Sequence, residues 1–218
     1  MFRLLAAVLL CTNTFFVCSQ SSEFGDWLIY FGNKKFNESW NLHHEIQYRN
    51  YNAIGDLEQL LIRGGVGYNL TPSNNNVLLG YGYILSNNYI GDGEKTSNSE
   101  HRIYQQFQSS NTFGRTTIKH RYRIEERFTE EDFLMRFRYF LALNVALTNK
   151  TITDNTLYLS LYNELFIGNK TPLFDRNRVY GGLGFKFNKA LKIELGYMNQ
   201  IFDGGGRDQL NIVLFATF

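Results

Sequence analysis

The residues best suited to chemistry in this 218-residue chain are arginines and glutamates at every second position of otherwise apolar segments. In "TTIKHRYRIEERF", the charged residues Arg121, Arg123 and Glu125 alternate with Tyr122 and Ile124. Guanidinium groups pair with carboxylates in bidentate geometry, and an unpaired guanidinium binds phosphate or a small carboxylate. The expected chemistry is therefore ion pairing or anion binding.

The same charged face recurs in several segments, which makes one continuous candidate set. Neighbouring strands lie about 4.8 Å apart, so side chains on one face of a sheet form a ladder. The candidate residues for the lumen and for solute binding are Glu45, Arg49, Arg102, Arg121, Arg123, Glu125, Arg136, Arg138, Glu164, Arg176 and Arg178. Because arginines outnumber glutamates in this set, the sequence predicts a basic site.

Alternation with a period of two residues also predicts the elements that carry this set. From "WNLHHEIQYRN" onward, ten segments have roughly the 9 to 11 residues that a tilted strand needs to cross a bilayer. An even number returns the chain to the side from which it enters, which favours ten strands. The segment "DWLIYFG", in which Trp27, Ile29 and Phe31 alternate, either pairs with a further strand, giving twelve, or packs in the lumen or along the rim.

Residues 1–19 form the expected secretory signal peptide, because Arg3 precedes the apolar run "LLAAVLL". A single exported domain then spans residues 20–218. Both cysteines, Cys11 and Cys18, fall inside the signal, so we expect no disulfide and no cysteine metal site in that domain. The chain's 22 basic and 20 acidic residues exclude a nucleic-acid binder that depends on bulk charge.

Two architectures share the alternating pattern: a soluble barrel or sandwich with its apolar face inside, and a membrane barrel with its apolar face outside. The polar face mixes arginine and glutamate with tyrosine, glutamine and glycine, which suits a crowded lumen where each arginine needs a partner. Four aromatic residues on the apolar face are expected at the membrane interfaces, near strand ends: Trp40, Tyr48, Tyr197 and Phe218. The sequence therefore predicts an all-β, antiparallel transmembrane barrel in the outer membrane of a Gram-negative cell.

The final stretch, "DQLNIVLFATF", is still alternating where it reaches Phe218. Outer-membrane barrels typically finish on a strand with a terminal aromatic residue, which the barrel-assembly machinery reads. We therefore expect that machinery and outer-membrane lipids as partners, and no nucleic acid. The last strand is also expected to pair with the first, because closure removes both free edges.

Six segments occur together in one order: "HRIYQQ", "KHRYRIEERF", "MRFRYF", "YNELFIG", "DRNRVYGGLGFKF" and "IELGYMNQ". On these segments the chain resembles a family of outer-membrane barrels that is common in Bacteroidota and catalogued as domain of unknown function 2490. The resemblance covers essentially the whole mature chain. It implies a location and a fold, and it brings no activity, cofactor or site residue.

Two classes of function stay open. The first is a structural barrel or a narrow, weakly anion-preferring channel for a small solute. The alternative is a lipid-modifying enzyme, an acyl hydrolase or acyltransferase with serine and histidine on the lipid-facing side. Three histidines fall on the predicted outward face: His44, His101 and His120. However, Ser160 points inward, and Ser109 and Ser110 lie at the far end of their strand from His101, so no catalytic residue is predicted.

Metal and cofactor sites are not predicted. Adjacent His43 and His44 point to opposite faces of a strand and cannot chelate one metal as a pair. The stretches "GGVG" and "YGGLG" lack the lysine and the following helix of a phosphate-binding loop. Glycines opposite bulky tyrosines inside a barrel explain them better.

Overall fold

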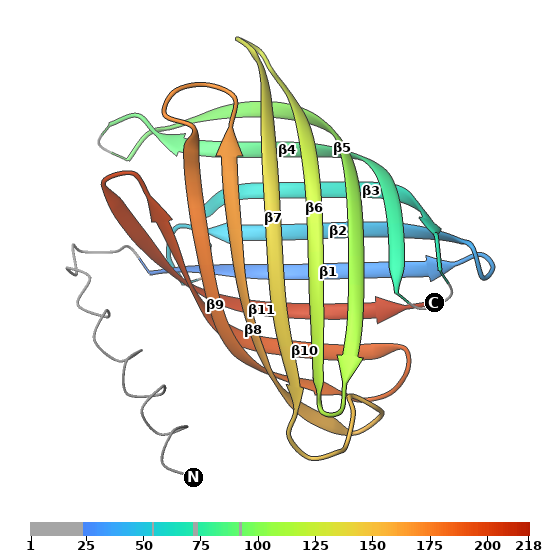
Figure 1. Ribbon diagram of the computed structural model, residues 1–218. Helices are drawn as coiled ribbons and strands as arrows, with labels where there is room; N and C mark the ends of the chain where they lie inside the picture. The colour runs from blue at the N-terminus through green and yellow to red at the C-terminus, as the bar shows by residue number, and fades with distance from the viewer. Residues whose placement is uncertain (1–23, 54, 72–73, 92) are drawn as a thin grey trace, which may run out of the picture.

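The computed structural model describes residues 24–53, 55–71, 74–91 and 93–218, and its regular elements are all strands (Figure 1). The predicted signal peptide, residues 1–19, lies outside the described residues. The strands are β1 (Gly25–Lys35), β2 (Trp40–Asn50), β3 (Leu57–Asn69), β4 (Asn75–Tyr89), β5 (Lys95–Phe113), β6 (Thr116–Thr129), β7 (Phe133–Ala146), β8 (Thr156–Gly168), β9 (Phe174–Lys186), β10 (Leu191–Phe202) and β11 (Gly205–Thr217). No helix long and apolar enough to cross a membrane occurs in the described part of the chain.

The strands close into one barrel in which each strand pairs antiparallel with the next along the chain. The prediction of an all-β barrel is confirmed, but the predicted counts of ten and twelve strands are wrong, because the described residues form eleven. The segment "DWLIYFG" is β1, and its second partner is β11 rather than a twelfth strand. Eleven strands are joined by ten antiparallel steps, and an even number of reversals leaves the first and last strands running the same way. This pair is therefore parallel, from Gly25 opposite Gln209 to Asn33 opposite Thr217.

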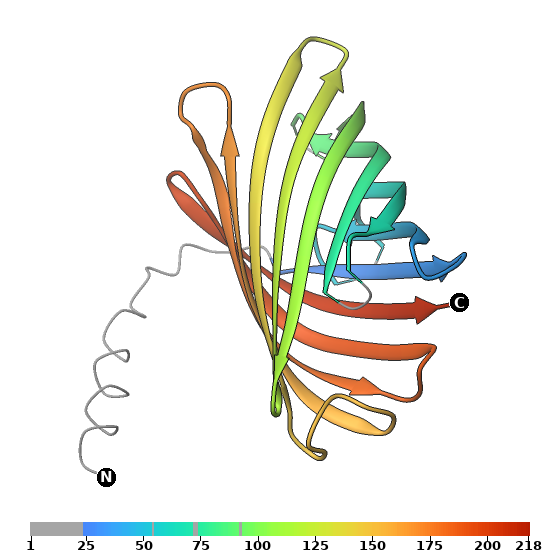
Figure 2. The ribbon, with the colours of Figure 1, turned by 45° about the vertical axis from the view of Figure 1, so that its right-hand side comes forward.

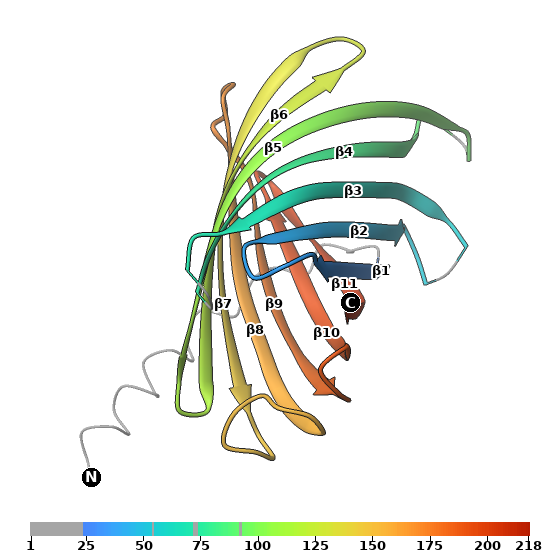
Figure 3. The same cartoon turned by 90° about the vertical axis from the view of Figure 1, so that its right-hand side faces the viewer.

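The strands turn progressively around the barrel. In Figure 1, β5 to β7 run steeply while β1 to β3 run across the view behind them. Figures 2 and 3 show the same curvature from two further directions, with the C-terminal end of β11 beside the C-terminal end of β1. The start of β1 and the end of β11 therefore lie at opposite ends of the barrel. We call the end with Gly25 the first end and the end with Phe218 the second end.

The connections at both ends are short. The longest runs from residue 147 to residue 155, and the two hairpins β5–β6 and β10–β11 have two-residue turns. Gly114 and Gly204 lie in these two turns with φ angles of 56° and 88°, which a residue without a Cβ adopts at little cost. Short connections leave the lumen to be filled by strand side chains.

The two faces of each strand carry different chemistry. On β7, Phe137 and Leu141 face outward and are 46% and 38% exposed, whereas Arg138 between them is 7% exposed. On β10, Leu195 is 55% exposed, and the preceding Glu194 is buried. The barrel thus has the predicted sidedness: apolar side chains cover its outer surface, and charged side chains occupy its lumen.

The parallel seam is the one sector whose inward face is also apolar. Trp27 and Ile29 of β1 form a buried cluster with Tyr180, Met198 and Val213 of the strands on the β11 side. Strands that are covered on both faces read as nearly continuous apolar runs, which accounts for the letters "DWLIYF" and "NIVLF". The segment is therefore a strand of the barrel wall, so the alternative that it packs in the lumen or along the rim is wrong.

Glycines inside the lumen make room for tyrosines on the neighbouring strand. Gly80 lies directly opposite Tyr104, and Gly184 lies directly opposite Tyr158. A Cβ built on Gly80 would come within 2.2 Å of the Cζ atom of Tyr104, whose ring is 1% exposed. The ring has no free space to move into, so the glycine is required by packing rather than by its backbone conformation.

We predict that Gly80→Ala lowers the free energy of unfolding by about 1–3 kcal/mol, because the new methyl group overpacks the lumen against Tyr104. Urea unfolding followed by tryptophan fluorescence measures the change. Gly64→Ala is the matched control on β3, since a Cβ there faces outward and its nearest neighbour is 3.8 Å away. Equal losses in the two variants would contradict the packing explanation.

Candidate functional site

The eleven predicted lumen residues all lie on the inward face of the barrel. Nine of them are buried: Glu45, Arg49, Arg102, Arg123, Glu125, Arg136, Arg138, Glu164 and Arg178. Arg121 and Arg176 are half-buried. The structure thus brings the predicted set together on facing and neighbouring strands, and we call this set, with its partners below, the lumenal ion network.

Glu125 on β6 is one centre of the lumenal ion network. Its carboxylate accepts hydrogen bonds from Arg136 at 2.6 Å and from Arg138 at 2.5 Å, both on β7. Arg123 and Arg102 lie farther away, at 3.5 Å and 3.8 Å. Glu125 stands directly opposite Arg136 in the β6–β7 register, so the cross-strand pairing that forms the sheet also forms the ion pair.

Glu164 on β8 is the second centre. Arg138 and Arg121 each donate to its Oε1 atom at 2.6 Å, and Arg178 lies 3.7 Å from Oε2. Arg138 therefore bridges Glu125 and Glu164 across three strands. A guanidinium keeps its charge in proteins, so each buried arginine here needs such partners to offset its lost hydration.

Two further carboxylates hold arginines near the first end. Glu100 accepts from Arg102 at 2.5 Å and from Arg127 at 2.6 Å. Asp175 accepts from Arg136 at 3.1 Å and from Arg176 at 2.5 Å. Together with Glu125 and Glu164, these groups link β5 to β9 by contacts between side chains.

Aromatic rings complete the environment of the arginines. The ring of Phe166, 1% exposed, has the guanidinium carbons of Arg138 and Arg178 at 4.5 Å and 4.6 Å from its centroid. The indole of Trp27 has Arg49 at 3.6 Å and Arg178 at 4.8 Å. Contacts of this kind stabilise a cation without neutralising it.

Arg49 differs from the other buried arginines in its partners. It donates to Gln47 at 3.0 Å and to Gln59 at 2.7 Å, and it lies over Trp27. Among the described residues, no carboxylate comes within 4.0 Å of it. Arg49 is thus a cation held by neutral groups, which is what an anion-binding site requires. However, its amide and indole partners already surround the guanidinium.

Three members of the network were missed in the sequence. Asp175 lies between predicted segments, at the start of β9, and carried no alternation signal. Phe166 follows Glu164 by two positions, so the period-two rule that placed Glu164 inward placed Phe166 there as well. The sequence left three positions open for Trp27, in a paired strand, in the lumen or along the rim, because it did not predict the parallel partner of β1.

The four predicted interface aromatics all face outward. Trp40 begins β2 and is 46% exposed, Tyr48 lies two residues before its end, and Phe218 follows β11 and is 66% exposed. For Tyr197 the predicted position near a strand end is wrong, because this residue lies near the middle of β10, five residues before Phe202. Its hydroxyl donates to Asp208, so a polar partner rather than a strand end explains it.

The outward histidines are placed differently from one another. His44 stacks on Phe218, with ring centroids 6.0 Å apart. His101 Nδ1 lies 2.5 Å from the hydroxyl of Tyr81, and His120 Nδ1 lies 2.9 Å from the hydroxyl of Tyr139.

The expectation that no outward serine accompanies a histidine is wrong. Strand β5 runs on to Phe113 and returns through the turn at Gly114, so Ser109 stands directly opposite His120. The sequence pattern placed Ser109 relative to His101 alone, because it predicted no hairpin turn at Gly114. The glycine of a two-residue hairpin turn was the signal that would have set the register.

Two ion pairs tie neighbouring turns together at the first end. Lys95 and Tyr89 both donate to Asp56, and the hydrogen bond from Lys95 lowers the pKa of Asp56. Lys170 donates to Asp132 and lowers the pKa of that carboxyl in the same way. The Lys170–Asp132 pair is exposed and the Lys95–Asp56 pair is half-buried. Both pairs lie at the rim, where water screens them, so they order the rim and contribute little to stability. In the described residues, no group of three or more His, Cys, Asp or Glu side chains is arranged to hold a metal ion.

We predict that Glu125→Gln lowers the free energy of unfolding by about 3–5 kcal/mol, because it leaves Arg136 and Arg138 buried beside a neutral group. Urea unfolding of the detergent-solubilised protein measures the loss. Glu126→Gln is the adjacent control: Glu126 faces outward, its contact with Gln105 is 3.4 Å long, and a change within about 0.5 kcal/mol is expected. A comparable loss in both variants would show that the network is not what stabilises the barrel.

Comparisons with known proteins bear on the family alone. No curated protein and no solved structure matches the chain. One family model matches residues 24–211, which include β1 to β10 and the start of β11 and hold every charged member of the lumenal ion network. The resemblance read from the sequence is therefore confirmed at the level of the family. The chain belongs to the family described as "Protein of unknown function (DUF2490)".

Proposed function

We propose that this chain is an integral β-barrel of a bacterial outer membrane, whose packed lumen serves as a structural core. The observation that carries the proposal is the inverted polarity of the barrel. Ile62, Leu183 and Leu195 are each about half exposed on the outer surface, whereas Arg63, Arg178 and Glu194 of the same strands are buried. A hydrocarbon environment is the one in which this arrangement is favourable.

The extent of the apolar surface supports a lipid environment over water. Soluble monomers rarely expose contiguous apolar patches larger than a few hundred Å². Here outward apolar side chains lie on all eleven strands, and closure leaves no edge with unpaired backbone groups. A membrane satisfies both features at once, since it requires a closed sheet and solvates its apolar face.

A row of aromatic side chains supports a particular depth for the barrel. The register aligns Trp40 with Tyr68, and it aligns Phe107 with Tyr122 and then Tyr139. The row begins at the second-end termini of β2 and β3 and reaches the middle of β6 and β7. Aromatic side chains near strand ends occupy the boundary between headgroups and acyl chains, so we propose the interface nearer the second end at Trp40 and Tyr68.

The lumen supports a structural role over an open pore. Arg49 of β2 and Arg178 of β9 meet on opposite sides of the seam at Trp27, and Arg178 continues to Glu164. Tyr162 of β8 donates to the sulfur of Met198 on β10 at 3.2 Å. The contacts of Arg178 with Trp27 and of Tyr162 with Met198 join strands that are not neighbours in the sheet, so side chains occupy the middle of the barrel.

Outer-membrane lipids are the proposed surroundings, and the barrel-assembly machinery is the proposed partner during insertion. For the latter we assign recognition to β11, whose outward face carries Leu210, Ile212, Leu214 and Phe218. The alternation of this strand is the feature that such machinery needs to align.

The two tryptophans of the chain provide a direct test of sidedness, because Trp40 is 46% exposed outside and Trp27 is 3% exposed inside. We predict that brominated lipids quench the emission of the Trp27→Phe variant, which retains Trp40, by at least about half. They leave the emission of Trp40→Phe, which retains Trp27, nearly unchanged. Fluorescence of refolded protein in vesicles of brominated and ordinary phosphatidylcholine measures both.

The pair of variants also separates the other outcomes. Quenching of Trp27 alone would mean that the polarity is reversed, and quenching of neither would mean that the protein does not enter the bilayer. Either result overturns the proposal. Equal quenching of both tryptophans would show an unfolded chain, which circular dichroism detects independently.

The structural role predicts that wild-type protein passes no discrete current steps in a planar bilayer, because the network fills the lumen. Steps that favour anions, and that change in Arg138→Ala but not in the outward variant Leu141→Ala, would instead establish the narrow channel. Insertion is verified on the same sample by the quenching of Trp40, so silence is not mistaken for failed reconstitution.

A further inference from the structure

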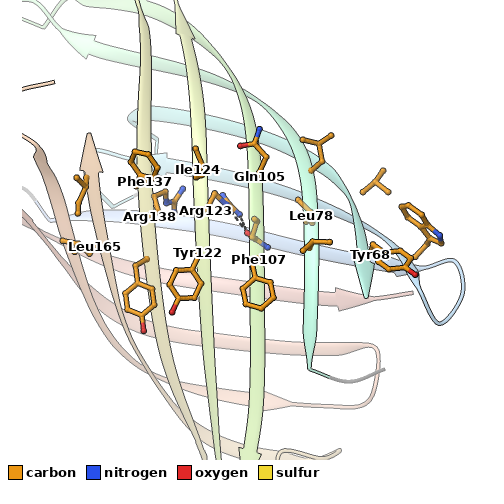
Figure 4. A pocket seen from close by; sticks show the side chains of 17 residues that line it. Tyr68, Leu78, Gln105, Phe107, Tyr122, Arg123, Ile124, Phe137, Arg138 and Leu165 are labelled. Carbon is orange, nitrogen blue, oxygen red and sulfur yellow. Dashed lines mark hydrogen bonds between the residues drawn. The ribbon is translucent and has the colours of Figure 1, made fainter. Parts of the chain in front are cut away.

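The outer surface of the barrel carries a groove of about 950 Å³ that the lumenal role does not use. Two outward rows of side chains line it. One row holds Phe107, Tyr122 and Tyr139, and the other holds Gln105 and Ile124 on the same strands. Figure 4 shows Phe107 and Tyr122 side by side on β5 and β6, with Ile124 above Tyr122.

The next outward row toward the second end contains polar groups instead. Asn75 of β4 stands opposite Ser109 of β5, Ser109 stands opposite His120 of β6, and His120 stands opposite Leu141 of β7. Side chains in directly opposite positions have Cβ atoms about 4.5–5.5 Å apart. Ser109 therefore stands between Asn75 and His120 in the register on the apolar side of the barrel, while the His120 ring lies against Tyr139 of β7.

The Tyr139 hydroxyl can hold His120 in the tautomer that a general base needs. The Nδ1 atom of His120 lies 2.9 Å from the hydroxyl oxygen of Tyr139, whose ring lies against that of Tyr122 with centroids 5.0 Å apart. We assign the Tyr139 oxygen as the acceptor of the Nδ1–H of His120. The lone pair of Nε2 is then free to take a proton.

We propose that Ser109 and His120 form a catalytic pair that hydrolyses an acyl ester of a membrane lipid, with the acyl chain in the groove. This proposal rests on the proposed membrane location, because only a lipid-facing surface meets such a substrate. The row lies one outward position closer to the second end than Phe107, Tyr122 and Tyr139, and the groove leads from it toward the first end.

The reaction needs only water as a co-reactant. His120 takes the proton of the Ser109 hydroxyl while its oxygen bonds to the ester carbonyl carbon, and the lipid alcohol leaves with that proton. Water then attacks the acyl-serine, its proton passes through His120 to the Ser109 oxygen, and the fatty acid departs. The amide of Asn75 is on the side from which it can donate to the developing oxyanion.

The chain contains a matched control for each catalytic residue. His101 is also outward and also has a tyrosine hydroxyl at Nδ1, but Tyr83 and Phe128 stand opposite it, so it has no serine to activate. Ser110 is the neighbour of Ser109 and faces the other side of the sheet. His101→Asn and Ser110→Ala are therefore expected to keep full activity.

The test uses refolded protein in mixed micelles with a fluorogenic diacyl phospholipid, and in parallel a fluorophosphonate that labels activated serines. Ser109→Ala and His120→Asn are expected to lower ester cleavage by at least about 100-fold, and Ser109→Ala to abolish labelling. Peptide mass spectrometry is expected to find the probe on Ser109. Tyr139→Phe, a change in a positioning residue, is expected to shift the pH profile of cleavage while Ser109 still reacts.

Failure of this proposal is distinguishable from failure of the membrane location. If brominated lipid quenches Trp40 but wild-type protein neither cleaves the ester nor reacts with the probe, the membrane location stands and the catalytic pair is wrong. Equal cleavage by Ser109→Ala overturns it as well, as does equal loss in His101→Asn. If Trp40 is not quenched, the location itself has failed.

Discussion

The rest of the structure depends on one constraint: arginines that cannot lose their charge must be buried beside carboxylates. Arg138 meets it by bridging Glu125 and Glu164, and Arg136 meets it with Glu125 and Asp175. A slip of one residue in the β6–β7 register would exchange the two faces of a strand. In the proposed membrane it would expose each guanidinium to lipid, at a cost of about 2–4 kcal/mol apiece at the bilayer midplane. The ion network therefore selects the register, and the register fixes which side chains face outward.

Closure of the barrel follows from a second requirement, that no edge remain unpaired. Ten antiparallel steps bring eleven strands round to a pair that runs in the same direction, and parallel pairing is slightly weaker per residue. Burial of apolar side chains at the seam between β1 and β11 offsets this weaker pairing. Trp27 and Ile29 pack with Val213 inside, while Leu28 and Ile212 cover the outer face of the same two strands. This is the sector where arginine and glutamate are replaced by apolar residues, and the cation–π contacts of Trp27 join it to the network.

The sequence predicted the parts of this fold that depend on alternation. Arg123, Glu125, Arg136 and Arg138 were placed inward because charge recurs every second residue, and the register then brought them together. The predicted number of strands depended instead on the even strand counts that are usual in outer-membrane barrels. The parallel pairing of β1 with β11 makes the count odd. Contacts between distant strands, such as Tyr162 with Met198, depend on how tightly the barrel curls, and no local pattern encodes that. The sequence could have predicted that Ser109 stands opposite His120, since the glycine of the two-residue turn fixes the register of β5 and β6. That turn was not predicted.

The two faces of the sheet are coupled through the strands that they share. His120 is bonded in the chain to Arg121, which Glu164 holds from inside, and Ser109 lies three residues from Gln106, which accepts from Arg123 at 2.6 Å. Groups that act together in a reaction need supporting side chains that keep them in place, and rigid strands provide this better than loops. The lumenal ion network supplies such support, because it fixes β5, β6 and β7 against one another at the level of the outward row. A packed lumen, which is of no use to a channel, would give the proposed reaction site on the outer face the rigid support that it requires.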